Sequence, residues 1–206
     1  PEVHRMFLAS YMFMVPVAMI FPNFPLLALF GSTQAGKSSF LKMFFLGSQE
    51  PGLVEHARGF DDYTTAGLIQ ASAGSSLLNC LDEFEAADDK TAGKKANTVS
   101  STLEATRNVA QGVRQTRGSQ GGQSRQDYFR FPMAIGAIHP FKKEEDVNRY
   151  VSVDFDRQPA GAAPPMVRVL KKYSPQRIAE IRRVLTLYPL QNAARLRRTY
   201  DEIYDK

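Results

Sequence analysis

Two glycines, a lysine and a serine near the start of the chain form the pattern G-x-x-x-x-G-K-S. Gly31 and Gly36 permit a turn tight enough for successive backbone N–H groups to point at one phosphate. In this pattern Lys37 reaches the β- and γ-phosphates as a point charge, and the hydroxyl of Ser38 is a ligand of Mg²⁺. The sequence therefore predicts a site for ATP and Mg²⁺. Its predicted binding residues are Gly31, Ser32, Thr33, Gln34, Ala35, Gly36, Lys37, Ser38 and Ser39.

Asp82 and Glu83 form an acidic pair directly after a short apolar segment, residues 76–81. A nucleotide-hydrolysing site needs one carboxylate on the side of the metal and another that orients the attacking water. We therefore predict that Asp82 lies on the Mg²⁺ side and that Glu83 is the general base, with Lys37 as a further catalytic group. The alternative is a solvated helix start, because more acids follow within residues 85–89 and acids favour helix N-termini.

These groups meet only if strands and helices carry them to one edge of a sheet. The apolar segment Leu26–Phe30 predicts a strand directly before the glycine pattern, and residues 39–46 predict the helix after it. Residues 76–81 predict a strand whose carboxyl end carries the acidic pair, where ligands bind in open α/β sheets. Because both flanks of the glycine pattern fit, a chance glycine-rich turn is disfavoured. Further strands are predicted within residues 128–138 and 151–155.

The predicted fold class is α/β, a three-layer P-loop NTPase with a mainly parallel sheet and a C-terminal helical segment. Residues 1–25 are predicted to form an apolar packing helix, 26–157 the ATPase core, and 158–206 a linker with a basic helical lid or tail. The 206 residues are near the size of one domain. Because the chain begins with Pro1 rather than methionine, we expect it to be part of a longer polypeptide with additional domains.

An uncharged run extends over residues 6–36, and residues 6–21 are almost wholly apolar. A membrane span needs about 20 apolar residues, whereas this run is shorter and is interrupted by Pro16. The basic head and the small-residue cleavage site of a signal peptide are not visible. The run therefore favours a buried packing helix over a membrane segment. The single cysteine, Cys80, is typical of a reducing compartment and predicts a cytoplasmic location.

The first of two basic regions is a low-complexity segment, residues 112–125, in a chain whose net charge is +5. It is rich in Gly, Gln and Ser and carries Arg114, Arg117 and Arg125 without an acid. Such a segment buries little apolar surface, so it predicts a mobile loop or a hairpin tip. The functional interpretation is contact of these arginines with nucleic-acid phosphates, and the alternative is a flexible linker.

The second basic region is the tail, residues 171–206, which has a helical pattern. Ser174 predicts a helix N-cap, followed by a proline at the first helical position. This helix is predicted to end at Pro189, and a second helix is predicted over residues 193–204. If the tail is a lid, one of its arginines contacts nucleotide, and the alternative is a solvated basic face. The candidates are Arg182, Arg183, Arg195, Arg197 and Arg198.

The order of these parts resembles the ATPase core of helicase-type AAA+ proteins. More narrowly, residues 6–157 resemble the ATPase domains of phage, plasmid and integrative-element primase-helicases. The specific patterns are the phosphate loop and residues 81–84, Leu-Asp-Glu-Phe. The resemblance implies ATP hydrolysis that drives translocation on DNA. It also implies a homo-oligomeric ring, taken as a hexamer, in the cytoplasm of a bacterial or phage-infected cell.

In that family an arginine just before the last strand acts on the γ-phosphate across a subunit boundary. The matching residue is Arg149, which would stabilise charge on the transferring phosphoryl group as an arginine finger. The alternative is a surface arginine that pairs with Glu144 or Glu145. The chain departs from the family where the preceding strand ends in His139 instead of a sensor asparagine.

Two other functions fit the same motifs. One is a nucleotide-dependent switch or effector ATPase, for example in a defence system, without DNA unwinding. The other is a P-loop kinase, which is least favoured because Asp82 and Glu83 supply a water-activating acid and no acceptor site is visible.

Overall fold

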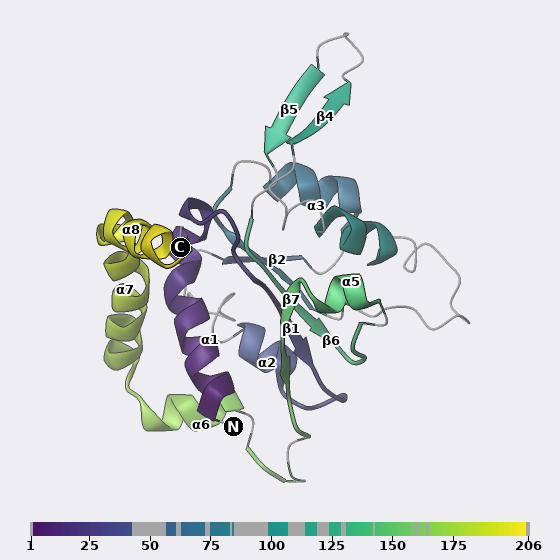
Figure 1. Cartoon of the computed structure of the whole chain (residues 1–206). Coiled ribbons are helices and arrows are strands. Elements are labelled where there is room, and N and C mark those ends of the chain that lie inside the picture. Colours follow the sequence, from purple (N-terminus) through teal and green to yellow (C-terminus); the bar gives the residue numbers. More distant parts are fainter. Residues whose placement is uncertain are drawn as a thin grey trace, which may run out of the picture.

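The computed structural model of the chain describes residues 2–42, 57–60, 63–72, 75–82, 84, 99–106, 114–118, 124–128, 131–141, 143–157, 159, 161–163 and 165–204. At its centre lies a five-stranded sheet with the order β2-β3-β6-β1-β7. Every neighbouring pair in this sheet is parallel (Figure 1), as predicted. The strands are β1 (Leu26–Phe30), β2 (Ala57–Phe60), β3 (Leu78–Leu81), β6 (Met133–Ala137) and β7 (Tyr150–Asp154).

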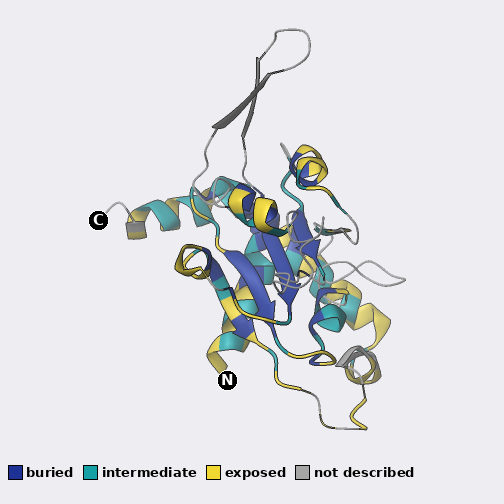
Figure 2. Ribbon diagram, turned by 90° about the vertical axis from the view of Figure 1, so that its right-hand side faces the viewer, coloured by how far each residue is buried: buried dark blue, intermediate teal, exposed yellow. Residues whose placement is uncertain are grey.

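Helices cover both faces of the sheet, which is why its central strands are apolar on both sides. On one face lie α1 (Glu2–Met14), the 3₁₀ helix η1 (Val15–Ile20) and α2 (Lys37–Leu41). On the other face lie α3 (Thr65–Ser72) and the helical residues 99–106. Alternate residues of β1 belong to two separate clusters of buried side chains, one on each face. Figure 2 shows the buried strands between helices that are exposed on their outer sides. The fold is therefore a three-layer α/β/α arrangement.

The remaining helices are α5 (Glu144–Val147), α6 (Pro165–Lys172), α7 (Pro175–Gln191) and α8 (Ala193–Tyr204). α7 packs on α1 and η1, α8 packs on η1, and α6 contacts α2. Ring contacts join these layers, with centroids 5.7 Å apart for Phe13 and Tyr188 and 5.2 Å apart for Phe21 and Tyr200. The helices from the two ends of the chain thus lie side by side on one flank of the molecule (Figure 1).

The apolar N-terminal run forms a helix that changes type at Pro16. α1 ends at Met14, and η1 continues with Pro16 in its first turn. Among the described residues one helical stretch, Glu2–Ile20, is long and apolar enough to cross a membrane by length and composition, with a mean hydropathy of 1.5. A third of that stretch (33%) is buried inside the protein. Tyr11 and Val15 belong to the core beside β1, so this segment packs on the sheet.

The predicted start of α7 is confirmed, and its predicted end is wrong. The Ser174 hydroxyl accepts a hydrogen bond from the backbone N–H of Arg177 at 3.2 Å, which caps the helix. The helix does not end at Pro189 but continues to Gln191. Asn192 supports the last turn, because its backbone and side-chain N–H groups donate to the carbonyl of Tyr188 at 3.1 and 2.9 Å. α8 has the predicted bounds.

The structure has two further elements, a hairpin and an edge strand. β4 (Arg114–Gly118) lies within the low-complexity segment and pairs as an antiparallel hairpin with β5 (Ser124–Tyr128), which begins at the end of that segment, in agreement with the hairpin alternative. β2 was not predicted, since its sequence Ala-Arg-Gly-Phe has little strand character. It pairs only with β3 at the edge of the sheet. Pairing with β3, rather than local propensity, explains this strand.

Candidate functional site

The glycine pattern forms a compact loop between β1 and α2. Gly31 has a φ of +154°, and a Cβ added there would lie 2.5 Å from the backbone oxygen of Phe155. A larger residue would fit only if Phe155, which follows β7, moved. Glycine at position 31 therefore allows the loop backbone to approach the backbone of Phe155. Gly36 has a φ of 98° and is the N-cap of α2. Gln34, at the exposed tip, also has a positive φ, 67°. The loop therefore turns as the motif requires.

Lys37 lies inside this loop. The residue is only 9% exposed, and its ammonium donates hydrogen bonds to the carbonyls of Gly31 and Ser32, the second at 3.1 Å. Its positive charge is therefore held at the loop's own backbone. The first turn of α2 adds N–H groups that have no intrahelical acceptor. A phosphate in the loop would meet a cation and helix-end donors together.

Ser38 and Asp82 form the contact that joins the two predicted motifs. The Ser38 hydroxyl donates to Oδ1 of Asp82 at 3.0 Å. Ser38 belongs to α2, which follows β1, whereas Asp82 directly follows β3. These strands are not neighbours, because β6 lies between them. The parallel sheet thus brings a hydroxyl and a carboxylate together at its carboxyl edge from segments that are 44 residues apart.

This pair suits a magnesium ion that is shared with a nucleotide. Mg²⁺ prefers oxygen ligands and is usually bound through one or two carboxylates together with substrate phosphates and water. Within the described ranges, no three or more His, Cys, Asp or Glu side chains form a group that could hold a metal by themselves. The residues present therefore fit a metal held jointly with phosphate oxygens, with Ser38 and Asp82 as the protein ligands. Glu83, the predicted base, lies outside the described residues.

Gly136 is a site residue that the sequence analysis missed. It lies in β6, between the two halves of the site, and a Cβ added there would be 3.1 Å from Oδ1 of Asp82. Its carbonyl accepts a hydrogen bond from the N–H of Phe84 at 2.8 Å. The signal that could have found it is a glycine inside an otherwise apolar strand, which often marks a close approach.

Arg149 lies at the opposite edge of the sheet from the phosphate loop. β7 runs parallel to β1, with Tyr150 beside Leu26 and Asp154 beside Phe30. The loop follows Phe30, whereas Arg149 precedes Tyr150. At about 3.3 Å per residue these strand ends are roughly 13 Å apart, so Arg149 is remote from the phosphate loop of its own chain. Its guanidinium donates to the backbone carbonyl of Glu145 at 2.9 Å.

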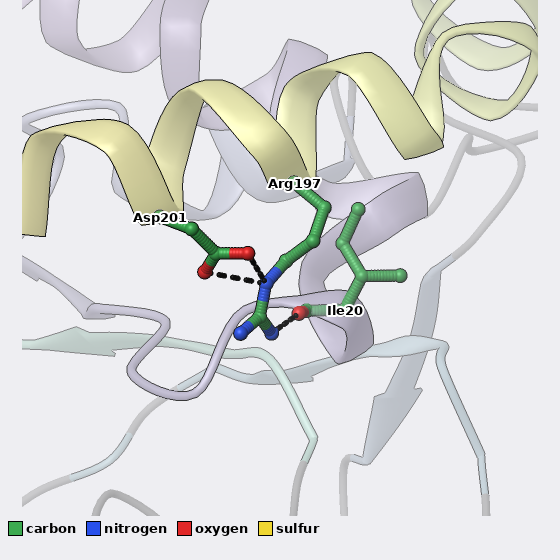
Figure 3. A network of polar contacts seen from close by, with 3 residues as sticks. All are labelled: Ile20, Arg197 and Asp201. Atoms are coloured by element: carbon green, nitrogen blue, oxygen red, sulfur yellow. Dashed lines mark hydrogen bonds and ion pairs between the residues drawn. The ribbon is translucent and has the colours of Figure 1, made fainter. Parts of the chain in front are cut away.

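The remaining basic candidates lie in the hairpin and in the two C-terminal helices. Arg114, Arg117 and Arg125 lie in the β4–β5 hairpin, whose backbone pairing is described. Arg197 is engaged elsewhere: its Nε donates to both Asp201 oxygens at 2.8 and 2.9 Å, and its NH1 donates to the carbonyl of Ile20 (Figure 3). This contact joins α8 to η1. The other predicted tail arginines, Arg182, Arg183, Arg195 and Arg198, belong to α7 and α8.

The parallel sheet, the β1–α2 loop and the covered faces define an α/β protein with a P-loop NTPase-like fold. No protein-family model matches the sequence, and a search of the curated proteins finds no match. Among solved structures the chain is similar to JCV helicase in a crystal structure with a bound thiazolopyridine-phenoxyphenyl acetamide. The identity is 12% and the TM-score 0.44, over 88% of this chain and 53% of that one. The chain thus spans about half the length of that structure. A likeness of this degree says nothing about activity, so function must be inferred from the site itself.

Proposed function

We propose that this chain binds ATP with Mg²⁺ and hydrolyses it. The observation that carries the proposal is the hydrogen bond between Ser38 and Asp82 beside a loop that contains Lys37. A buried lysine, helix-end N–H groups, a hydroxyl and a carboxylate together match the needs of a triphosphate and its metal. A chance glycine-rich turn would not require the carboxylate of a non-adjacent strand to meet the serine.

In the proposed reaction each residue has a separate task. The ammonium of Lys37 leaves the carbonyls of Gly31 and Ser32 and donates hydrogen bonds to phosphate oxygens, whose negative charge it neutralises. Ser38 and Asp82 would hold the metal, which would supply positive charge that stabilises the phosphate oxygens. Glu83 accepts a proton from the attacking water. Arg149 is proposed to stabilise the transferring phosphoryl group of a neighbouring subunit in a ring of six, because it is remote from the loop of its own chain.

The test is nucleotide affinity, measured with a fluorescent ATP analogue in magnesium and in EDTA. Lys37→Ala should weaken binding roughly 30-fold in both buffers, since it removes charged hydrogen bonds of about 2 kcal/mol. Ser38→Ala should weaken binding only in magnesium. The matched control is Lys171→Ala, an exposed lysine on α6 that should bind normally. Absence of nucleotide binding by the unaltered chain would refute the proposal.

We further propose that hydrolysis drives movement on DNA. The arginine-bearing hairpin supports this, as does the resemblance of residues 6–157 to the ATPase domains of primase-helicases. ATPase of the full-length protein should then rise with single-stranded DNA, and DNA affinity should fall steeply with salt. Replacing Arg114, Arg117 and Arg125 by Ala should remove this stimulation and leave basal hydrolysis intact. An ATPase indifferent to DNA would indicate the rival function, a nucleotide-dependent switch or effector.

A further inference from the structure

Gly136 lies in the strand beside β3, close to the segment that carries the acidic pair. β6 lies between β1 and β3, so its carboxyl end is next to both the phosphate loop and Asp82. We propose that Gly136 is a positioning residue, whose missing side chain sets where the Asp82 carboxylate lies relative to Ser38. This inference rests on the proposed function and assigns the geometry of its metal site to a residue outside both motifs.

Side chains of Asp82 and Leu41 lie where a side chain at position 136 would be. An added Cβ would be 3.1 Å from Oδ1 of Asp82, closer than most real Cβ contacts, and 3.4 Å from Cδ1 of Leu41. That same Oδ1 accepts the Ser38 hydrogen bond at 3.0 Å. A methyl group would push this oxygen away by a few tenths of an ångström, and we expect this shift to disturb its hydrogen bond with Ser38. Leu41, at ordinary contact distance, is much less affected.

The backbone at Gly136 does not by itself need glycine. Gly136 is not among the glycines with positive φ, and it lies in a regular buried strand. Its carbonyl accepts from the N–H of Phe84 at 2.8 Å, and any residue at this position keeps that carbonyl. Gly136 thus binds Phe84 through its carbonyl and leaves room for the carboxylate of Asp82, two residues earlier in the chain. An alanine at position 136 tests the space alone and leaves the backbone anchor in place.

The experiment compares the magnesium-dependent gain in nucleotide affinity of Gly136→Ala with that of the unaltered chain. Affinity in EDTA should change less than about twofold, whereas the gain from magnesium should fall about tenfold, the usual loss when a supporting partner of a metal site is altered. The matched control is Gly67→Ala in α3, where an added Cβ would also approach to 3.1 Å, but against the hydroxyl of Thr64. An unchanged magnesium gain in Gly136→Ala would overturn the proposal.

A double-variant cycle separates positioning from general packing. If Gly136 acts through the carboxylate, Gly136→Ala should have no further effect on nucleotide affinity in an Asp82→Ala background. If Gly136→Ala lowers the melting temperature, Asp82→Ala should restore it, because the shorter side chain removes the close contact. If neither result is found, Gly136 affects the packing of α2 and not the position of the carboxylate. The melting arm needs no nucleotide, so it tests this contact even if the proposed ATPase function fails.

Discussion

At the residue scale, the site depends on side chains whose ordinary chemistry is altered by burial. Lys37 is almost fully covered, yet it keeps backbone carbonyl partners for its ammonium. These partners are replaceable, because the carbonyl groups can accept hydrogen bonds from water when the lysine donates to a phosphate. A buried ammonium that donates to backbone carbonyls can exchange them for the oxygens of a phosphate.

Cys80 is the second residue whose chemistry the fold changes. It is 1% exposed, and it precedes Asp82 by two positions at the end of β3. Burial, followed by the charge of Asp82, raises the pKa of the Cys80 thiol well above its ordinary value. The folded thiol therefore stays protonated and unreactive at neutral pH. Because the unfolded thiol loses its proton at lower pH, this group makes the protein less stable as the pH rises above the ordinary thiol value.

Cys80 is thus a probe of unfolding, since it is the single cysteine in the chain. We expect a thiol reagent to label it only through opening of the sheet. Saturating MgATP, at about 100 times its dissociation constant, should slow labelling roughly 100-fold, because the bound form must release its ligand before it opens. The rate of Cys80 labelling with and without MgATP can be followed by absorbance or mass spectrometry. Rapid labelling of the native protein would contradict the buried position of β3.

At the element scale, Arg197 forms a polar link between α8 and the N-terminal segment. It contacts Asp201 of its own helix and the carbonyl of Ile20, and its guanidinium lies over the ring of Tyr200 at 5.8 Å. The Ile20 carbonyl ends η1, where helix carbonyls lack intrahelical donors. A predicted nucleotide-contacting candidate is therefore used to dock two helices from opposite ends of the chain.

Arg197→Gln should weaken this docking. Loss of the hydrogen bond to Ile20 should lower the opening free energy of α8 by about 1 kcal/mol, after allowance for partial exposure of the ion pair. Backbone amides of α8 should then exchange hydrogen roughly fivefold faster. Arg198→Gln removes the same charge from an exposed neighbouring position and is the matched control. Equal exchange in both variants would show that overall charge, and not the Ile20 contact, holds α8.

At the scale of the whole molecule, the two proposed catalytic regions lie at opposite edges of one sheet. The phosphate loop follows the carboxyl end of β1, and Arg149 precedes the amino end of β7. A single chain therefore cannot bring Arg149 to its own loop without rebuilding the sheet. In the proposed ring the two edges would meet between neighbouring copies, because head-to-tail contacts join different surfaces.

Mixing two inactive variants tests this arrangement in the full-length protein. Glu83→Gln lacks the proposed base and Arg149→Ala lacks the proposed finger, so neither should hydrolyse ATP alone. In an equal mixture, roughly a quarter of the subunit contacts combine an intact base with an intact arginine, and activity should recover to about that level. Each variant alone at the same total concentration is the control. No recovery in mixed assemblies would remove Arg149 from catalysis.

The sequence by itself determined the local elements of this protein. The glycine spacing, the apolar strand before it and the Ser174 cap are local signals, because turn geometry, burial and capping depend on neighbouring residues. They predicted β1, the loop and the start of α7. They failed for β2, whose strand conformation depends on its partner β3, and for Pro189, which the last turn of α7 accommodates.

Tertiary structure alone decided which distant segments meet. Placing β6 between β1 and β3 brings Ser38 to Asp82 and puts Gly136 beneath them, and the parallel register of β7 takes Arg149 to the far edge. The packing of α8 on η1 likewise commits Arg197 to Ile20. The motifs predicted that Ser38 and Asp82 share a metal, but they did not contain the strand order or the register, because these are set by burying two apolar faces at once across the whole chain.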